Sequence, residues 1–309
     1  MQSLWMLLAT FLFAIMGVCV KLASDYYSIA EIVMARGAIG VIVIGALMLL
    51  RGDTLRTRFA RHHLWRGTVG VTAFWMWFYA IATLPLSMAM TLNYMAPIWI
   101  AAILFIGGWW RGVRSFEPGM ILAIMASFIG VTLLLQPAMH ASQWMGALIA
   151  LASGMLAALA YLQVRELGKM GEPESRVVFY FSLTSTLAGL GGVLLAPGPL
   201  ANAALWHVPS TRGLLLLLAI GGCATVAQMA MTRAYRLGKI LVTANLQYTG
   251  IVFSSFWGVL LWQDVLGWKG WSGIAVILSS GLVATYYNTR SISSTDVVVT
   301  RSDPIASEV

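Results

Sequence analysis

Two apolar stretches of the chain carry neutral polar side chains in the same order. At one constant offset Tyr94 aligns with Tyr248. At the same offset Asn93 aligns with Gln247. Amide and phenol groups donate and accept hydrogen bonds, so they suit the holding of a solute better than its chemical conversion. The pattern therefore predicts a binding site built from two halves of the chain. The two stretches are YAIATLPLSMAMTLNYMAPIW (79–99) and RAYRLGKILVTANLQYTGIVF (233–253).

Further amides and aromatic residues lie in or near apolar runs and extend the candidate set. A single polar side chain in a membrane more often holds helices together, at about 0.6 kcal/mol on average, than it binds a ligand. Asn93-Tyr94 and Gln247-Tyr248 occupy equivalent positions in the two stretches, which favours a ligand-binding role for these four residues. The candidate substrate-binding residues are Tyr79, Asn93, Tyr94, Pro97, Trp99, Tyr161, Gln163, Gln228, Asn245, Gln247 and Tyr248.

Pro97 stands inside an apolar run, where its ring removes one helical hydrogen bond and frees the carbonyl of Asn93. In hydrocarbon a freed carbonyl needs another protein group, water or a ligand. Two interpretations stay open, a packing kink and a substrate site. The second stretch has Ile251 in place of the proline, so a kink there must come from Thr249 and Gly250.

Arg36 is predicted to lie inside a membrane span, where a charge is costly and is a functional candidate. Its side chain has four alternatives: an outer gate, an ion pair with Asp25 or Glu31, extension outward to the interface, or direct contact with the substrate. We therefore assign a gate or ion-pair role to Arg36 and Glu31.

Several absences limit the chemistry. No acidic residue falls at the middle of an expected span, and all four histidines fall in expected loops. No HExxH or GxSxG motif is present, so the chain is not expected to be an enzyme, with no catalytic residue, metal site or cofactor. Apart from Arg36 no basic residue is expected at mid-span, which favours a neutral or zwitterionic cargo. A solute channel remains the alternative from another class.

The composition defines the class of protein. Hydrophobic residues make up 60% of the 309 residues and charged residues only 10%, whereas about a quarter of a soluble domain is charged. We therefore expect an all-α protein of a lipid bilayer. The net charge of +8 is explained by basic loops and not by binding of nucleic acid.

Ten membrane spans are predicted from the apolar runs. Fifteen of the 19 Lys and Arg residues would lie on one side, which predicts that both termini are cytoplasmic, in a cell inner (plasma) membrane. The loop 51–66 is expected to form a short basic surface helix, and the tail after Asn288 to be disordered. The expected spans are 4–23, 29–50, 64–84, 86–108, 116–136, 143–165, 175–196, 210–232, 239–262 and 266–287.

Five spans in each half have a topological consequence. Two copies of a unit with an odd number of spans must cross the membrane in opposite directions, as in the inverted repeats of secondary transporters. We expect one repeat at 1–140, a second at 141–288 and a cytoplasmic tail at 289–309.

The five-plus-five arrangement, the turn at 234–238 (AYRLG) and the element Asn93-Tyr94-x-x-Pro97 resemble the EamA-type drug/metabolite transporter superfamily. The resemblance covers about 4–287 and is greatest to the YddG-type amino-acid exporters. It implies ten helices around a central cavity, alternating access, and export of small metabolites such as amino acids. A carrier of another metabolite or drug is the alternative. The expected partners are a small solute, the bilayer and a proton or other coupling ion, whereas the oligomeric state is left open.

Overall fold

A computed structural model describes residues 2–110, 126, 129, 143–195, 210–238, 240–263, 267–276, 278, 279 and 283. In this part of the chain every labelled regular element is an α-helix. The helices are α1 (Gln2–Ala23), α2 (Ile29–Arg51), α3 (Ala60–Thr83), α4 (Leu86–Asn93), α5 (Ala96–Trp110), α7 (Trp144–Lys169), α8 (Glu174–Leu195), α9 (Thr211–Leu237), α10 (Ile240–Leu246) and α11 (Thr249–Trp262).

Local sequence signals set several helix ends. Ser28 caps α2 and forms a capping box with Glu31, which satisfies backbone N–H groups that have no partner within the helix. Gly52 ends the same helix in the left-handed conformation, with φ of 71°, which glycine adopts without steric cost. Ser210 caps α9 in the same manner as Ser28. These ends position α2 and α9 within the bundle.

Six helical segments are long and apolar enough to cross a membrane, by length and composition. They agree with six of the expected spans, and α3 covers a seventh, 64–84, with a more polar sequence. The expected span 116–136 lies outside the described residues except for two of them, and 266–287 is described only in part. Most of the helices are thus shown, whereas the count of ten is not.

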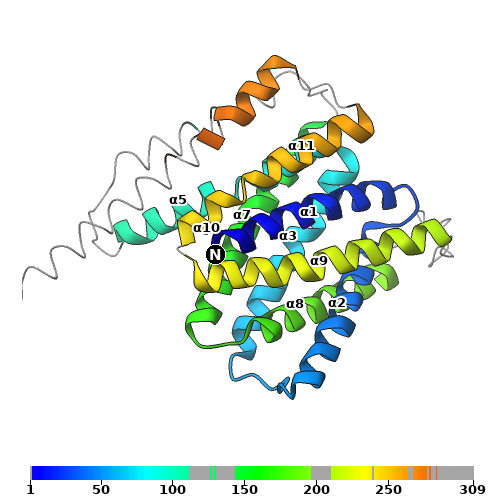
Figure 1. Cartoon of the computed structure of the whole chain (residues 1–309), viewed down its shortest axis with the longest axis vertical. Coiled ribbons are helices and arrows are strands. Elements are labelled where there is room, and N and C mark those ends of the chain that lie inside the picture. Colours follow the sequence, from blue (N-terminus) through cyan, green and yellow to red (C-terminus); the bar gives the residue numbers. More distant parts are fainter. Residues whose placement is uncertain are drawn as a thin grey trace, which may run out of the picture.

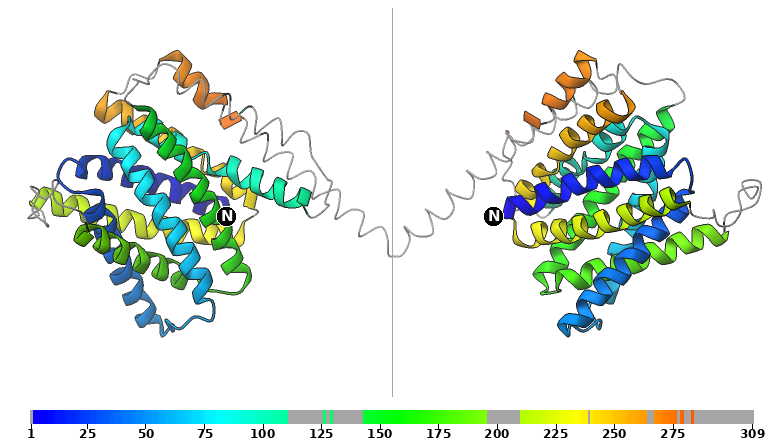
Figure 2. Two further views of the ribbon diagram at one scale, coloured as in Figure 1. Left: turned by 180° about the vertical axis from the view of Figure 1, so that it is seen from behind. Right: turned by 45° about the vertical axis from the view of Figure 1, so that its right-hand side comes forward.

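The helices from the two halves of the chain alternate in the bundle. In Figures 1 and 2, α1 lies along α9 and α2 along α8, and α3 packs against α7. The α2–α8 contact is very close, because a Cβ at Gly37 would lie 2.5 Å from the backbone nitrogen of Thr186. A Cβ at Gly189 would lie 2.5 Å from the backbone nitrogen of Met34. Small residues are what permits such approach in membranes.

The small residues of α7 serve helix packing. Ala150 and Ala158 are completely buried. A Cβ at Gly146 would contact Thr83 and Leu84 at the end of α3. The small face of α7 is therefore a contact surface for the first half of the chain.

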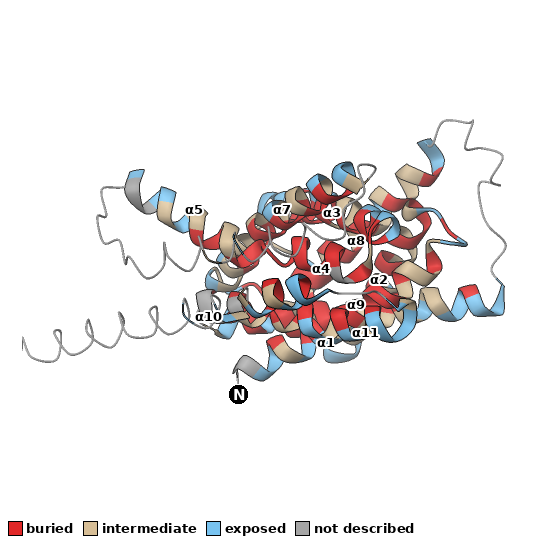
Figure 3. Cartoon of the chain, turned by 90° about the horizontal axis from the view of Figure 1, so that it is seen from above, coloured by how far each residue is buried: buried red, intermediate tan, exposed pale blue. Residues whose placement is uncertain are grey.

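Buried residues follow the inner faces of the helices, and exposed residues gather on the outer faces and at helix ends (Figure 3). Large apolar side chains such as Leu148, Leu187 and Leu215 are exposed. In water such a surface would be unfavourable, whereas in a bilayer lipid chains cover it.

The surface helix expected between Arg51 and Arg66 is wrong. The chain is non-helical from Asp53 to Phe59, and α3 begins at Ala60. The basic residues that suggested a surface helix are therefore divided between an extended loop and the first turns of a packed helix. This difference changes the position of Arg66, as described below.

Candidate substrate-binding site

Both polar stretches contain a break in a helix. In the first, α4 ends at Asn93 and α5 begins at Ala96. In the second, α10 ends at Leu246 and α11 begins at Thr249, although no proline is present there. Pro97 lies in the first turn of α5, where its fixed φ is favourable and its missing N–H needs no partner. The expected kink is therefore a two-residue turn between two helices in both stretches, and some backbone hydrogen bonds, such as Tyr94 N–H to Met90, continue through it.

The two breaks face each other in the bundle. Helix α4 packs against α11, and α5 packs against α10. The ring of Tyr94 lies directly over Gly250, since a Cβ at that glycine would be 2.6 Å from two of the ring carbons. The Tyr94 ring at the first break thus occupies the space that a side chain at position 250, beside the second break, would need.

A small, partly open cavity lies beside the first break, with about 320 Å³ of space between its atoms when the adjoining solvent is included. Aromatic rings dominate its wall, and one amide and two phenols supply polar groups. The cavity is lined by Phe13, Ala73, Phe74, Trp77, Asn93, Tyr94, Ala157 and Tyr161.

Asn93 is held in place by α7. Its side-chain nitrogen donates to the hydroxyl of Ser153 at 2.8 Å, and that hydroxyl donates to the carbonyl of Ala150 at 2.6 Å. The neighbouring Gly154 permits the approach, because a Cβ there would lie 2.8 Å from the carbonyl oxygen of Asn93. The end of α4 therefore rests on the backbone of α7.

Several buried polar atoms near the breaks have no hydrogen-bond partner among the described residues. They include the hydroxyl of Tyr94, the side-chain oxygen of Gln247 and both polar atoms of the Gln228 side chain. Gln247 lies beside the Tyr161 hydroxyl, and the Tyr161 ring stacks on Tyr235 with centroids 5.2 Å apart. An unpaired buried polar group costs free energy. A ligand that supplies a partner would recover that cost.

Other candidate residues lie elsewhere. Tyr79 is 38% exposed, and Gln163 lines a separate surface pocket with Arg61, His62 and Trp65. Trp99 is half-buried and lies outside the cavity wall. Gln228 and Tyr248 are buried but do not line the cavity. The side chain of Asn245 is outside the described part.

Arg36 is buried and points into the protein. Its guanidinium carbon lies 4.0 Å from the centroid of the Phe74 ring, and its Nη1 donates to the hydroxyl of Ser185 at 3.4 Å. Among the described residues no carboxylate lies within ion-pairing distance of it. Glu31 instead accepts hydrogen bonds from the backbone and hydroxyl of Ser28. Arg36 therefore contacts aromatic rings and does not form the ion pair with Glu31 that the sequence suggested.

Arg66 is the functional candidate that sequence reasoning missed. It was expected at the cytoplasmic surface, yet its side chain is only 2% exposed, and its guanidinium carbon lies 4.0 Å from the Phe181 centroid. Arg66 thus adds a second buried basic residue to Arg36, near the beginning of α3 and not at its middle. A signal existed in the sequence, because Arg66, Gly70, Ala73 and Trp77 lie on one face at helical spacing.

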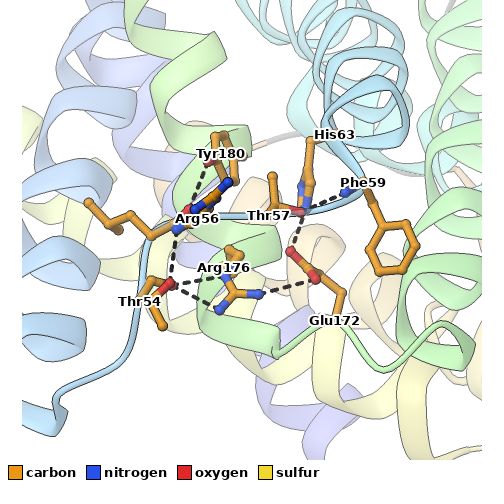
Figure 4. A network of polar contacts seen from close by, with 9 residues as sticks. Thr54, Arg56, Thr57, Phe59, His63, Glu172, Arg176 and Tyr180 are labelled. Carbon is orange, nitrogen blue, oxygen red and sulfur yellow. Dashed lines mark hydrogen bonds and ion pairs between the residues drawn. The ribbon is translucent and has the colours of Figure 1, made fainter.

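A polar network ties the loop after α2 to the beginning of α8 (Figure 4). Glu172 lies 2.9 Å from the ring nitrogen Nε2 of His63 and accepts from Arg176 at 3.2 Å. Arg176 also donates to the carbonyl of Thr54, and Tyr180 donates to the carbonyl of Leu55. The network closes this end of the bundle between the two halves of the chain.

Burial lowers the pKa of His63 from its usual value of 6.5, and it outweighs the hydrogen bond with Glu172, which acts in the opposite direction. The unfolded chain therefore binds more protons than the folded chain below about pH 6.5. The stability that His63 contributes is present above that pH and is lost as the pH falls through the lowered pKa. We expect the melting temperature of purified protein to drop between about pH 7 and pH 5.

His63→Gln should flatten this pH dependence, whereas His62→Gln, at the exposed neighbouring position, should leave it in place. The pKa of Glu172 is also lowered from 4.5, because hydrogen bonds from His63 and Thr57 and the charge of Arg176 together outweigh burial, the largest single effect, which raises it. Its contribution is lost only below about pH 4.5, so the two groups act in separate pH windows. An unchanged slope in His63→Gln would contradict the assignment.

An apolar helical bundle with broken helices around a small cavity defines the class of membrane transporter. The chain belongs to the EamA-like transporter family. The model of that family matches residues 1–136. The pseudopaline exporter of Pseudomonas aeruginosa is 32% identical over 264 residues, which cover 84% of this chain and 86% of that protein.

More distant similarities agree. A riboflavin transporter of Vibrio cholerae is 25% identical over 93% of this chain and 94% of its own length. One solved structure, a protein crystal structure, superposes with a TM-score of 0.69 at 19% identity, over 92% of this chain and 98% of that one. At that identity the superposition shows the fold alone. The chain is thus a multi-pass membrane protein of a transporter family.

Proposed function

We propose that this protein is a secondary carrier that exports a small organic metabolite across the inner membrane by alternating access. The cavity beside the facing helix breaks carries the proposal, because it combines unpaired polar groups with aromatic walls. Transporters commonly place the substrate between repeats, where interrupted helices expose backbone groups. We further propose that both termini are cytoplasmic, on the basis of the distribution of basic residues.

The pairing of helices supports two inverted repeats. In the proposed numbering α1 and α9 contain spans one and eight, and α7 and α3 contain spans six and three. Exchange of the two halves converts the first pair into the second, and both pairs are in contact. The α2–α8 pair maps onto itself, and the α4–α11 contact maps onto the α5–α10 contact.

The names of the relatives support export of a small metabolite but not an amino acid. One relative is an exporter of pseudopaline and another transports riboflavin. We therefore propose the broader class of small organic metabolites in place of the amino acids expected from the sequence. No catalytic role is proposed.

Tyr94→Phe is expected to reduce transport while folding stays intact. The substitution removes only a hydroxyl that has no partner among the described residues, so stability should change little. A lost hydrogen bond to the cargo of about 1.4 kcal/mol would lower the apparent affinity about tenfold. The measurement is counterflow into liposomes that contain purified protein, with a panel of metabolites, in the presence and absence of a proton gradient.

Tyr79→Phe is the matched control, because it removes the same group from an exposed position on α3. Alanine at Asn93, Tyr94, Gln247 and Tyr248, one at a time, extends the test to both breaks. Normal transport in all four alanine variants would refute the site. Counterflow also separates a carrier from a channel, since only a carrier exchanges solute against its own gradient.

A further inference from the structure

Two arginines in the interior of the bundle lie against the same aromatic ring. Arg36 of α2 and Arg66 of α3 are 3% and 2% exposed. Their guanidinium carbons lie 5.1 Å and 4.0 Å from the centroid of the same ring, that of Phe181. Because both distances are measured to the same ring centroid, the two guanidinium carbons lie no farther apart than the sum of the two distances.

The cationic pair lacks a counter-charge. Among the described residues neither guanidinium has a carboxylate within ion-pairing distance, and the nitrogens Nε of both and Nη1 of Arg66 have no hydrogen-bond partner. Contact with aromatic rings stabilises a buried cation in part. It does not satisfy N–H donors, and a buried charge without a partner is strongly unfavourable.

The pair lies next to the cavity. Phe74 forms part of the cavity wall and carries Arg36 on its ring at 4.0 Å. The Phe181 ring, on which Arg66 lies, packs against Phe74 with the ring centroids 5.6 Å apart. The arginines therefore lie directly behind the aromatic wall of the cavity and do not line the cavity themselves.

We infer that Arg36 and Arg66 form an anion subsite that binds an ionised carboxylate of the cargo, so that the exported metabolite is an organic acid. The inference rests on the proposed transport function and names its substrate class. Guanidinium groups bind carboxylates through paired, parallel hydrogen bonds, and arginine remains charged at every physiological pH. The neutral or zwitterionic cargo favoured by the sequence was based on the absence of this second charge.

Binding to purified full-length protein tests the inference apart from transport. The probes are succinate, its neutral analogue succinamide, inorganic phosphate, and sodium chloride at matched ionic strength, each followed by thermal unfolding in detergent. Succinate should raise the melting temperature with saturation, and succinamide should not. Stabilisation by phosphate but not by succinate, or an equal effect of sodium chloride, would overturn the carboxylate subsite.

Variants separate binding from a packing role. Arg66→Met removes the buried charge and retains an apolar chain, so the variant should melt at the same or a higher temperature without a probe. It should also need at least about tenfold more succinate for the same stabilisation. Arg61→Met, at an exposed position of the same helix, is the matched control and should respond like the unmodified protein. A lower melting temperature with an unchanged succinate response would show a purely structural arginine and overturn the inference.

Arg36→Met provides a second, independent variant in case Arg66→Met does not fold, and it should lose the succinate response in the same way. Counterflow distinguishes this inference from the proposed function. If a neutral metabolite exchanges while no carboxylate binds, the carrier stands and the subsite fails. If succinate binds to the arginines but no metabolite exchanges, the subsite stands and the carrier fails.

Discussion

Gly154→Ala is expected to destabilise the protein and abolish transport together. The added Cβ would lie 2.8 Å from the carbonyl oxygen of Asn93 and 3.0 Å from that of Leu92. Both are backbone atoms at the end of α4, so no side chain can rotate away. Excess volume in a packed interior costs about 1–3 kcal/mol. The displacement would also strain the 2.8 Å hydrogen bond between Asn93 and Ser153.

The measurements are thermal unfolding in detergent and counterflow in liposomes. Gly222→Ala on α9 is the matched control, because no atom lies within 4 Å of its added Cβ. That variant should retain transport and be as stable as the parent protein or more so, since alanine favours a helix by up to about 1 kcal/mol over glycine. If Gly154→Ala and Gly222→Ala had the same melting temperature and the same transport rate, the contact between α7 and the end of α4 would have no effect on stability or transport.

Glu172→Ala should cause a comparable loss of stability at the other end of the bundle. The carboxylate is 3% exposed and is shared between His63 and Arg176. Its removal leaves a buried imidazole without its partner, which costs about 1–3 kcal/mol. We expect a lower melting temperature and faster proteolysis in the loop 52–59, which the same network holds to α8.

Glu166→Ala removes a carboxylate from a pair of the same chemistry in an exposed setting. The side chains of Lys169 and Glu166 are 54% and 53% exposed, and such surface pairs contribute about 0–1 kcal/mol. The melting temperature of this variant should therefore stay close to that of the parent. If the Glu172 and Glu166 variants melt alike, the network of Figure 4 contributes no stability.

Sequence reasoning could predict the helix breaks because proline and the Thr249–Gly250 pair disturb helices locally. It could also predict Asn93, Tyr94 and Tyr161 as cavity residues, since polar groups in apolar runs are rare. Local chemistry of this kind is visible in a single chain. The expected facing of the two stretches agrees with the packing of α4 against α11, and only the structure shows that Tyr94 lies over Gly250.

Sequence reasoning erred at Tyr79, Gln163 and Arg66 because the direction of a side chain depends on where its helix begins and on its position around the helix. Tyr79 and Gln163 each lie two positions from a cavity residue, Trp77 and Tyr161, which turns them about 200° away around the helix. Arg66 was expected at the boundary between the basic loop 51–66 and the span 64–84, whereas α3 already begins at Ala60. One additional turn of helix converts a surface charge into an interior one.

The two interrupted helices place four helix termini inside the bundle. Some of the first N–H groups of α5 and α11 and the last carbonyls of α4 and α10 bond at the turns, as the Gly250 N–H does to Gln247, and each terminus carries a partial charge. These groups belong to the main chain, and every amino acid except proline supplies them. Alanine scanning would leave them unchanged and would underestimate the affinity that the breaks provide. If the breaks hold the cargo as proposed, substitutions of the side chains around the cavity would change its selectivity and leave these backbone donors and acceptors in place.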